Sequence, residues 1–199
     1  FHNAELLFQE AIKEDPKFRL AHSYLANVYI SLIMLWGDLP PSTGARKAMS
    51  VLSNVLQNDT LYIDFATLGI MEFNANKNYS KADHYFKRAI ALNPGDELTY
   101  YFYANLLCIL GRTDEALEQL DKAKTINPVN TWELTTRGEV YYASGRYNES
   151  IKVFEEAIQV FPNVTALYDA LGRAYVFFFF YPDAISTLTE GLTHSTIRP

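Results

Sequence analysis

The side chains that most often carry catalysis are present in this chain but are not grouped. The histidines are scattered, and the single cysteine, Cys108, has no neighbour at a metal-ligand spacing. No phosphate-binding G-x-x-x-x-G-K loop, dinucleotide glycine loop or G-x-S-x-G nucleophile motif occurs. We therefore predict no metal site, no cofactor and no enzymatic activity. The histidines are His2, His22, His84 and His194.

Paired carboxylates are the remaining candidates for acid–base chemistry. Glu155 and Glu156 adjoin each other on a predicted helix, but they lie on its outer face among lysines. Carboxylates in that setting are usually solvated surface charges, and no base or nucleophile accompanies them. We interpret them as surface residues.

The overall composition argues against nucleic acid and membranes as binding partners. The chain has 199 residues, and its 49% hydrophobic content is sufficient for a sizeable core. Its net charge of -6 argues against a nucleic-acid surface, because phosphate neutralisation requires clustered Lys and Arg. The apolar stretches 28–36 and 175–181 are shorter than the roughly 20 residues that cross a bilayer. We expect no membrane insertion, and the start at Phe1 suggests a piece of a longer protein.

Three prolines mark an internal repeat. Pro94, Pro128 and Pro162 recur at a constant interval and end the similar segments RAIALNP, KAKTINP and EAIQVFP. The interval is about 34 residues, a length typical of repeats built from a pair of helices. A degenerate copy of the same helix end falls at Thr60, one further period back, whereas the preceding interval, from Pro16, is ten residues longer. We assign these extra residues to an insertion near 34–45, between two helices.

Each unit of the repeat predicts a pair of packed helices. Its first helix has a small residue between large ones, and its second helix has a large residue between small ones. Small residues let two backbones approach, and large side chains fill the space beside them. In one unit the series is Leu134, Gly138, Tyr141, then Ser150, Phe154, Ala157.

The turns within the pairs carry their own signals. Gly111 and Gly145 are expected to adopt the left-handed conformation that ends many helices. Asp114 and Asn148 are expected to open the helices that follow.

These residues resemble the tetratricopeptide repeat (TPR) family over essentially the whole chain. The resemblance implies an all-α fold, a right-handed superhelical TPR solenoid of antiparallel helix pairs with about five and a half repeats, forming a single domain over residues 1–199. The predicted units are 1–16, a lone second helix; 17–60, with the insertion; 61–94; 95–128; 129–162; and 163–199, the terminal repeat.

A narrower resemblance concerns the segments LWGDLPPSTGARKA, KADHYFKRAIALNP and LLCILGRTDEALEQLDKAKTINP. They look like the carboxy-terminal TPR region of bacterial multidomain transcriptional regulators and nucleotide cyclases. The resemblance implies a sensory or regulatory segment of a larger bacterial protein. It also implies a cytoplasmic location, or a periplasmic one if the parent protein is a membrane-anchored regulator.

The family resemblance also implies a binding groove, in which ligand-facing positions on the first helices contact a protein or peptide. This mixture of aromatic rings, amides and charges resembles a peptide-binding wall, with anchors for apolar side chains and amides for extended backbone. The alternative that Tyr101, Trp132 and Tyr142 only pack between adjacent first helices stays open. The matching positions are Asn27, Tyr101, Asn105, Trp132, Thr135, Glu139, Tyr142, Asp169 and Arg173.

An aromatic run, YVFFFFYPDA, follows in the terminal unit at residues 175–184. In register, Phe179 replaces the turn glycine of the earlier units, and a phenylalanine at positive φ costs roughly 1 kcal/mol or more. Four aromatic side chains cannot all be buried inside one turn, so we expect an exposed aromatic patch here, made of Phe177, Phe179, Phe180 and Tyr181. Such patches usually contact a partner, or a second copy in a homodimer. An alternative is that this patch covers the terminal repeat or packs on residues beyond Pro199. The rival to groove binding is thus a structural oligomerisation or assembly module with no external groove ligand.

Overall fold

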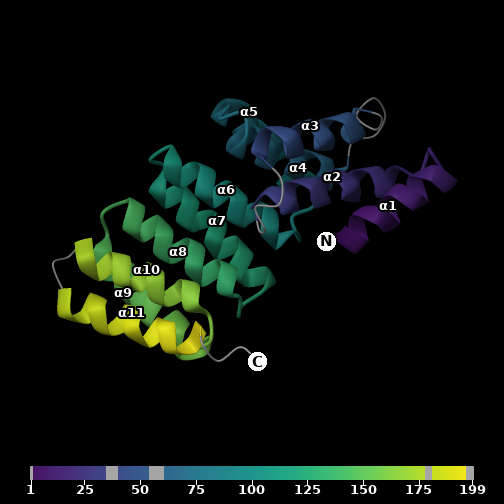
Figure 1. The fold of residues 1–199 in the computed structure, drawn as a ribbon. Coiled ribbons are helices and arrows are strands. Elements are labelled where there is room, and N and C mark those ends of the chain that lie inside the picture. Colours follow the sequence, from purple (N-terminus) through teal and green to yellow (C-terminus); the bar gives the residue numbers. More distant parts are fainter. Residues whose placement is uncertain (1, 35–39, 54–60, 178–180, 196–199) are drawn as a thin grey trace. The chain divides into compact units, whose positions relative to one another are not determined.

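The computed structural model describes residues 2–34, 40–53, 61–177 and 181–195 (Figure 1). Over these ranges the chain forms helices and no strand, which confirms the all-α prediction. None of the helices in these ranges is both long and apolar enough to cross a bilayer. The helices are α1 (His2–Glu14), α2 (Arg19–Met34), α3 (Pro41–Leu52), α4 (Tyr62–Asn74), α5 (Tyr79–Leu92), α6 (Glu97–Ile109), α7 (Thr113–Ile126), α8 (Thr131–Ala143), α9 (Tyr147–Val160), α10 (Thr165–Phe177) and α11 (Tyr181–Ser195).

The chain divides into two compact units, residues 1–99 and 100–199. In the first unit, α1 packs on α2, α2 pairs with α3, and α4 pairs with α5 and contacts α2. The connection between α2 and α3 includes residues 35–39, which lie outside the described ranges, and residues 41–45 of the expected insertion already belong to α3.

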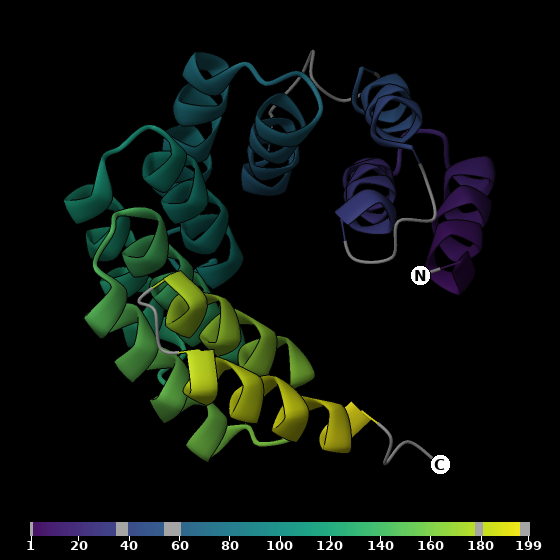
Figure 2. The ribbon, with the colours of Figure 1, turned by 60° about the vertical axis from the view of Figure 1, so that its left-hand side comes forward.

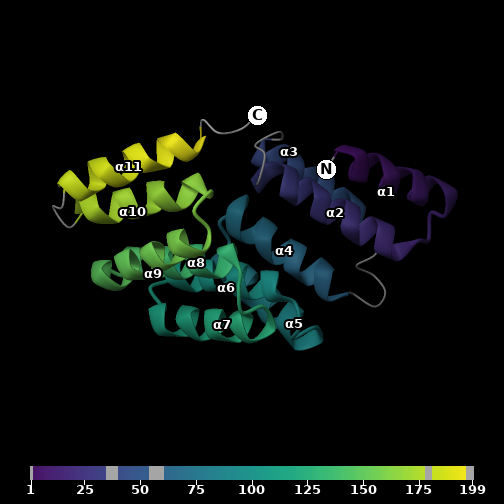
Figure 3. The same cartoon turned by 90° about the horizontal axis from the view of Figure 1, so that it is seen from below.

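The second unit continues the pattern of paired helices. Helix α8 pairs with α9 and α10 pairs with α11, and each pair appears side by side in Figures 1 and 3. Helix α10 also packs on α9 and α8, and α7 packs on α8. Figure 2 shows these helices, coloured green to yellow, following one another in a stack. The first helices of the pairs, α6, α8 and α10, position the candidate site.

A glycine lies at the closest approach within several pairs. A Cβ atom added to Gly138 would overlap the ring of Phe154, which is 1% exposed. The same contact recurs between Gly69 and Phe86, where the added Cβ would lie 2.7 Å from the ring. Close packing leaves no room for a methyl group at either glycine. The predicted pairing of a small residue with a large one is confirmed at these positions.

The two turn glycines have the left-handed conformation that the sequence predicts. Gly111 has φ 72° and Gly145 has φ 77°, both in the left-handed region that glycine adopts without a steric penalty. The next residue donates its backbone N–H back into the helix, with Arg112 N–Leu107 O and Arg146 N–Tyr141 O both at 2.9 Å.

The predicted helix-opening residues were wrong. Helix α7 begins at Thr113 and α9 at Tyr147, so Asp114 and Asn148 already lie inside the first turn. Arginines precede both helices and pair with glutamates three residues later; Arg112 contacts Glu115 at 2.5 Å, and Arg146 and Glu149 form the second pair. These ion pairs span the first turn of the helix in place of a side-chain cap.

A buried ion pair within α8 is joined to α7 by a second, exposed ion pair. The side chain of Glu133 is 2% exposed, and its carboxylate accepts a hydrogen bond from Arg137 Nε at 2.5 Å. Arg137 Nη2 reaches across to Asp121 of α7 at 2.7 Å. Burial, the largest single effect, lowers the pKa of Arg137, but the hydrogen bonds to Glu133 and Asp121 and the negative charges of these carboxylates together raise the pKa above its ordinary value. The guanidinium therefore stays charged and links the two helices.

Candidate peptide-binding groove

A cavity of about 450 Å³ lies between the first helices of the second unit. Helix α6 contributes one lining residue, α8 contributes five, and the other two come from the turn before α10 and from its first residues. Four of the residues predicted from the sequence meet in this cavity, namely Asn105, Trp132, Thr135 and Glu139. The full lining is Asn105, Thr131, Trp132, Thr135, Thr136, Glu139, Val164 and Ala166.

Trp132 is the main apolar surface of the groove. Asn130 accepts a hydrogen bond from the backbone N–H of Trp132 at 2.8 Å, which caps α8 and fixes its first turn. The indole ring is 43% exposed and lies 6.4 Å, centroid to centroid, from the ring of Phe102 on α6. Together with Val164 and Ala166, it gives the cavity an apolar lining. Such a lining can accept an apolar side chain.

Charged side chains lie farther along the same helices. Arg173 of α10 donates to Glu139 of α8 at 2.7 Å and pairs with Asp169 one turn away at 3.2 Å. All three side chains are at least one-third exposed, because Glu139 is 35%, Arg173 49% and Asp169 65% exposed. One guanidinium is thus shared by two carboxylates, and the cluster carries a net negative charge.

Two aromatic rings, Tyr142 and Phe177, meet near the last residues of α8 and α10. Their ring centroids lie 5.8 Å apart in an edge-to-face arrangement, and Tyr147 of α9 lies 5.0 Å from Phe177. Phe177 is still 56% exposed. Of the other members of the predicted aromatic patch, Phe179 and Phe180 and the side chain of Tyr181 lie outside the described part of the structure.

Two predicted groove residues are not among those that line this cavity. Tyr101 is only 1% exposed, so its side chain belongs to the core and is not available to a groove ligand. Asn27 belongs to α2 of the first unit, where its carbonyl accepts a hydrogen bond from Ser31 at 3.0 Å. Asn105 does line the cavity, and its amide donates to the Tyr101 carbonyl at 3.1 Å.

The sequence reasoning missed some lining residues. Thr131 and Thr136 flank predicted positions on α8, whereas Val164 and Ala166 come from the turn and first residues that lead into α10. The repeat could have located Ala166, because it lies one full period after Trp132. Val164 precedes the helix, where the helical pattern gives no signal.

Cys108 reports on the charge of this groove. Burial raises the pKa of its thiol, and the negative charge of Glu139 raises it further. A raised pKa means that the reactive thiolate forms only at higher pH. We expect the pH midpoint of iodoacetamide alkylation to lie above that of a free cysteine, and Glu139→Gln to lower it. Asp114→Asn, which removes an exposed carboxylate on α7, is the control; an unchanged midpoint in Glu139→Gln would contradict the prediction.

Parts of the chain match models of a known repeat family. Models described as tetratricopeptide repeat match residues 73–131 and 133–164. The chain is 26% identical over 98 residues to small glutamine-rich tetratricopeptide repeat-containing protein 2 of Mycosarcoma maydis, which covers 49% of this chain and 28% of that protein. The chain thus spans less than a third of that relative's length.

Solved structures show the same fold at low sequence identity. The Cut9–Hcn1 hetero-tetramer of the APC/C matches with a TM-score of 0.76 and 17% identity, over 99% of this chain and 37% of that one. YrrB, described as a TPR protein with an unusual peptide-binding site, matches with a TM-score of 0.56 and 18% identity, over 96% of this chain and 93% of that one. The paired helices, their glycine contacts and these matches show that the chain has the fold of a tetratricopeptide repeat solenoid, and the family models match it over residues 73–131 and 133–164.

Proposed function

We propose that the groove formed by α6, α8 and α10 binds an extended segment of a partner protein. One observation carries the proposal: four residues predicted as ligand-facing from the sequence line a single cavity of about 450 Å³. YrrB, a TPR protein of similar fold with an unusual peptide-binding site, supports the same role. No residue of the groove has a catalytic function in this proposal.

The lining defines the chemistry of the bound segment. Trp132, Val164 and Ala166 offer a recess for an apolar side chain, and Asn105 and Thr135 offer hydrogen-bonding groups to extended backbone. Farther along, Glu139 and Asp169 outnumber Arg173. A lysine or arginine on the ligand is therefore favoured there over a terminal carboxylate, which the cluster would repel.

A selection from a random nonapeptide library, followed by fluorescence anisotropy with the full chain, tests the proposal. We expect the selected peptides to combine an apolar residue with a basic one. Trp132→Ala should weaken their binding about tenfold, because buried aromatic anchors contribute most of the affinity of such interfaces. Val160→Ala, a change at a 55% exposed residue of α9, is the matched control.

Two outcomes would contradict this function. Selected peptides that bind Trp132→Ala as well as the wild-type chain would place their site outside the groove. A chain that selects no peptide but has a dimeric mass in light scattering would favour the alternative assembly function. The exposed ring of Phe177 is the structural observation that supports that alternative.

We further infer that the segment serves as the sensory or regulatory part of a larger protein, in line with its resemblance to bacterial regulators. The relative from Mycosarcoma maydis, of which the chain matches 28%, shows that such repeats occur within longer proteins. Occupation of the groove would then be transmitted to the attached domains.

A further inference from the structure

The groove residues of α8 form one stripe with an apolar end and a charged end. Trp132, Thr135 and Glu139 occupy positions i, i+3 and i+7 of α8, which project from the same face of a helix. All three line the cavity of about 450 Å³. Because an α-helix rises 1.5 Å per residue, Trp132 and Glu139 are separated by about 10.5 Å along its axis. A ligand that contacts both ends must span that distance.

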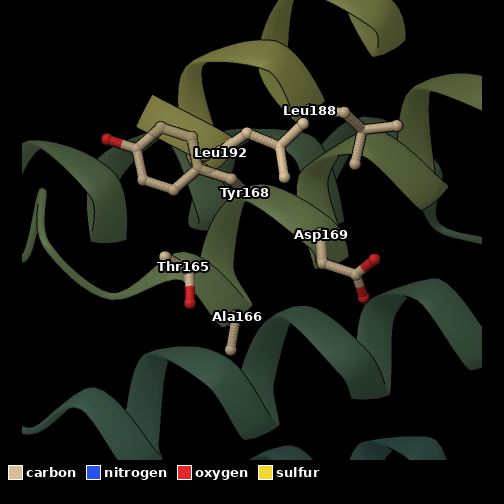
Figure 4. Close-up of a pocket in the computed structure, with 7 residues that line it drawn as sticks. Thr165, Ala166, Tyr168, Asp169, Leu188 and Leu192 are labelled. Carbon is tan, nitrogen blue, oxygen red and sulfur yellow. The ribbon is translucent and has the colours of Figure 1, made fainter. Parts of the chain in front are cut away.

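Helix α10 repeats the same order of residues. Ala166, Asp169 and Arg173 occupy the equivalent positions one repeat period later. Figure 4 shows Ala166 and Asp169 along the first two turns of α10. The apolar ends of the two stripes meet, since Ala166 lines the cavity with Trp132. The charged ends also meet, since Arg173 donates to Glu139 at 2.7 Å.

The separation of the two ends favours one backbone conformation of the ligand. In a polyproline II helix, residues three positions apart project from the same side and lie about 9.3 Å apart. In a β-strand, side chains on the same side are two or four residues apart, at about 7 or 13 Å. The polyproline II spacing therefore matches the groove to about 1 Å, and the β-strand spacings differ from it by about 3 Å.

The polar lining suits the same conformation. A polyproline II backbone has no internal hydrogen bonds, so its N–H and C=O groups remain available to other partners. Asn105 and Thr135 line the cavity and can bond to these groups. Aromatic surface is a common feature of grooves that bind polyproline II segments, and the exposed indole of Trp132 supplies it here.

We propose that the groove binds a polyproline II segment of a partner protein that carries an apolar residue and a lysine or arginine three positions apart. The apolar side chain lies on Trp132, and the cation lies between Glu139 and Asp169. These two carboxylates share only Arg173, so the cluster is negatively charged and attracts a cation. This inference rests on the proposed function and adds the conformation of the ligand and the spacing of its two contacts.

A spacing series of synthetic peptides tests the proposal. The probe is a fluorescently labelled nonapeptide that contains Leu-Pro-Pro-Lys, titrated with the full chain and followed by anisotropy. Two further peptides of the same composition place the leucine and the lysine two or four positions apart. We expect the probe to bind at least about tenfold more tightly than either, because only its spacing brings both side chains to one side. Replacing its two prolines with glycine should weaken binding, because the backbone is then less ordered before binding.

Variants of the charged cluster test the second contact. Glu139→Gln/Asp169→Asn should weaken binding of the probe about tenfold, and this loss should vanish when norleucine replaces the lysine of the peptide. Arg173→Gln should instead strengthen binding about threefold, because the cation of the ligand then has no competitor. Asp114→Asn/Glu118→Gln, which removes the same charge from exposed positions on α7, is the matched control and should leave binding unchanged.

Trp132→Ala separates this inference from the proposed function. If all peptides lose affinity with Trp132→Ala but bind equally well at every spacing, or best at two or four, the polyproline II geometry is wrong and the groove-binding function stands. A loss of affinity in Arg173→Gln would likewise overturn the placement of the cation, because Arg173 would then support the site instead of competing with the ligand. If no peptide depends on Trp132, both the inference and the proposed function fail.

Discussion

Replacing Arg137 with methionine is expected to lower the free energy of unfolding by about 3 kcal/mol. The variant keeps most of the side-chain volume but removes the guanidinium, so the carboxylate of Glu133, whose side chain is 2% exposed, loses its partner. A buried charge without a partner must be desolvated without compensation. Chemical denaturation monitored by circular dichroism measures the change.

The double variant Glu133→Leu/Arg137→Met is the control for this prediction. Replacing both charges with apolar groups of similar size is often neutral or stabilising, so the double variant should regain most of the lost stability. Asp121→Ala, which removes only the 69% exposed partner, should cost less than about 1 kcal/mol. If Arg137→Met and the double variant were equally unstable, the unpaired buried charge of Glu133 would not explain the loss of stability.

Replacing Phe154 with alanine is expected to lower the free energy of unfolding by about 3–5 kcal/mol. The ring is 1% exposed, lies directly over Gly138, and forms the buried cluster with Leu167 and Leu171 of α10. Its removal leaves a cavity that weakens two contacts of α9, one with α8 and one with α10. Thermal and chemical denaturation should both show the loss.

Gly138→Ala gives the matched test of the same contact. Alone it should destabilise the chain by about 1–3 kcal/mol despite the better helix propensity of alanine, because the added Cβ would overlap the Phe154 ring. In the background of Phe154→Ala the same change should be neutral or stabilising, because the obstructing ring is absent. Additive effects of the two substitutions would contradict the proposed contact.

The helix pairs were predictable because several independent signals share one period. The prolines, the small residues and the turn glycines each recur at the same interval, and each has a local physical effect that does not depend on the rest of the fold. The positions of Asn105, Trp132, Thr135 and Glu139 in one cavity follow from the same register.

Other features depend on packing that the register does not determine. Helix α6 is apolar around most of its circumference, with Tyr100, Tyr101 and Tyr103 all buried, so its pattern does not single out a groove-facing side. Tyr101 was assigned to the groove from its position in the repeat, and nothing in the pattern of α6 indicated that it is buried. The openings of α7 and α9 were missed because a capping asparagine or aspartate was sought, whereas Arg112 and Arg146 form ion pairs with the first turn.

The glycine turns at Gly111 and Gly145 have a consequence for engineering. Nothing lies within 4 Å of the position a Cβ would occupy at either residue, so these connections border open space. Closing a longer loop costs little additional entropy, and each doubling of its length adds only about 0.6 kcal/mol. Either turn should therefore accept an inserted epitope or fluorescent reporter, with the adjoining helices left to pair as before.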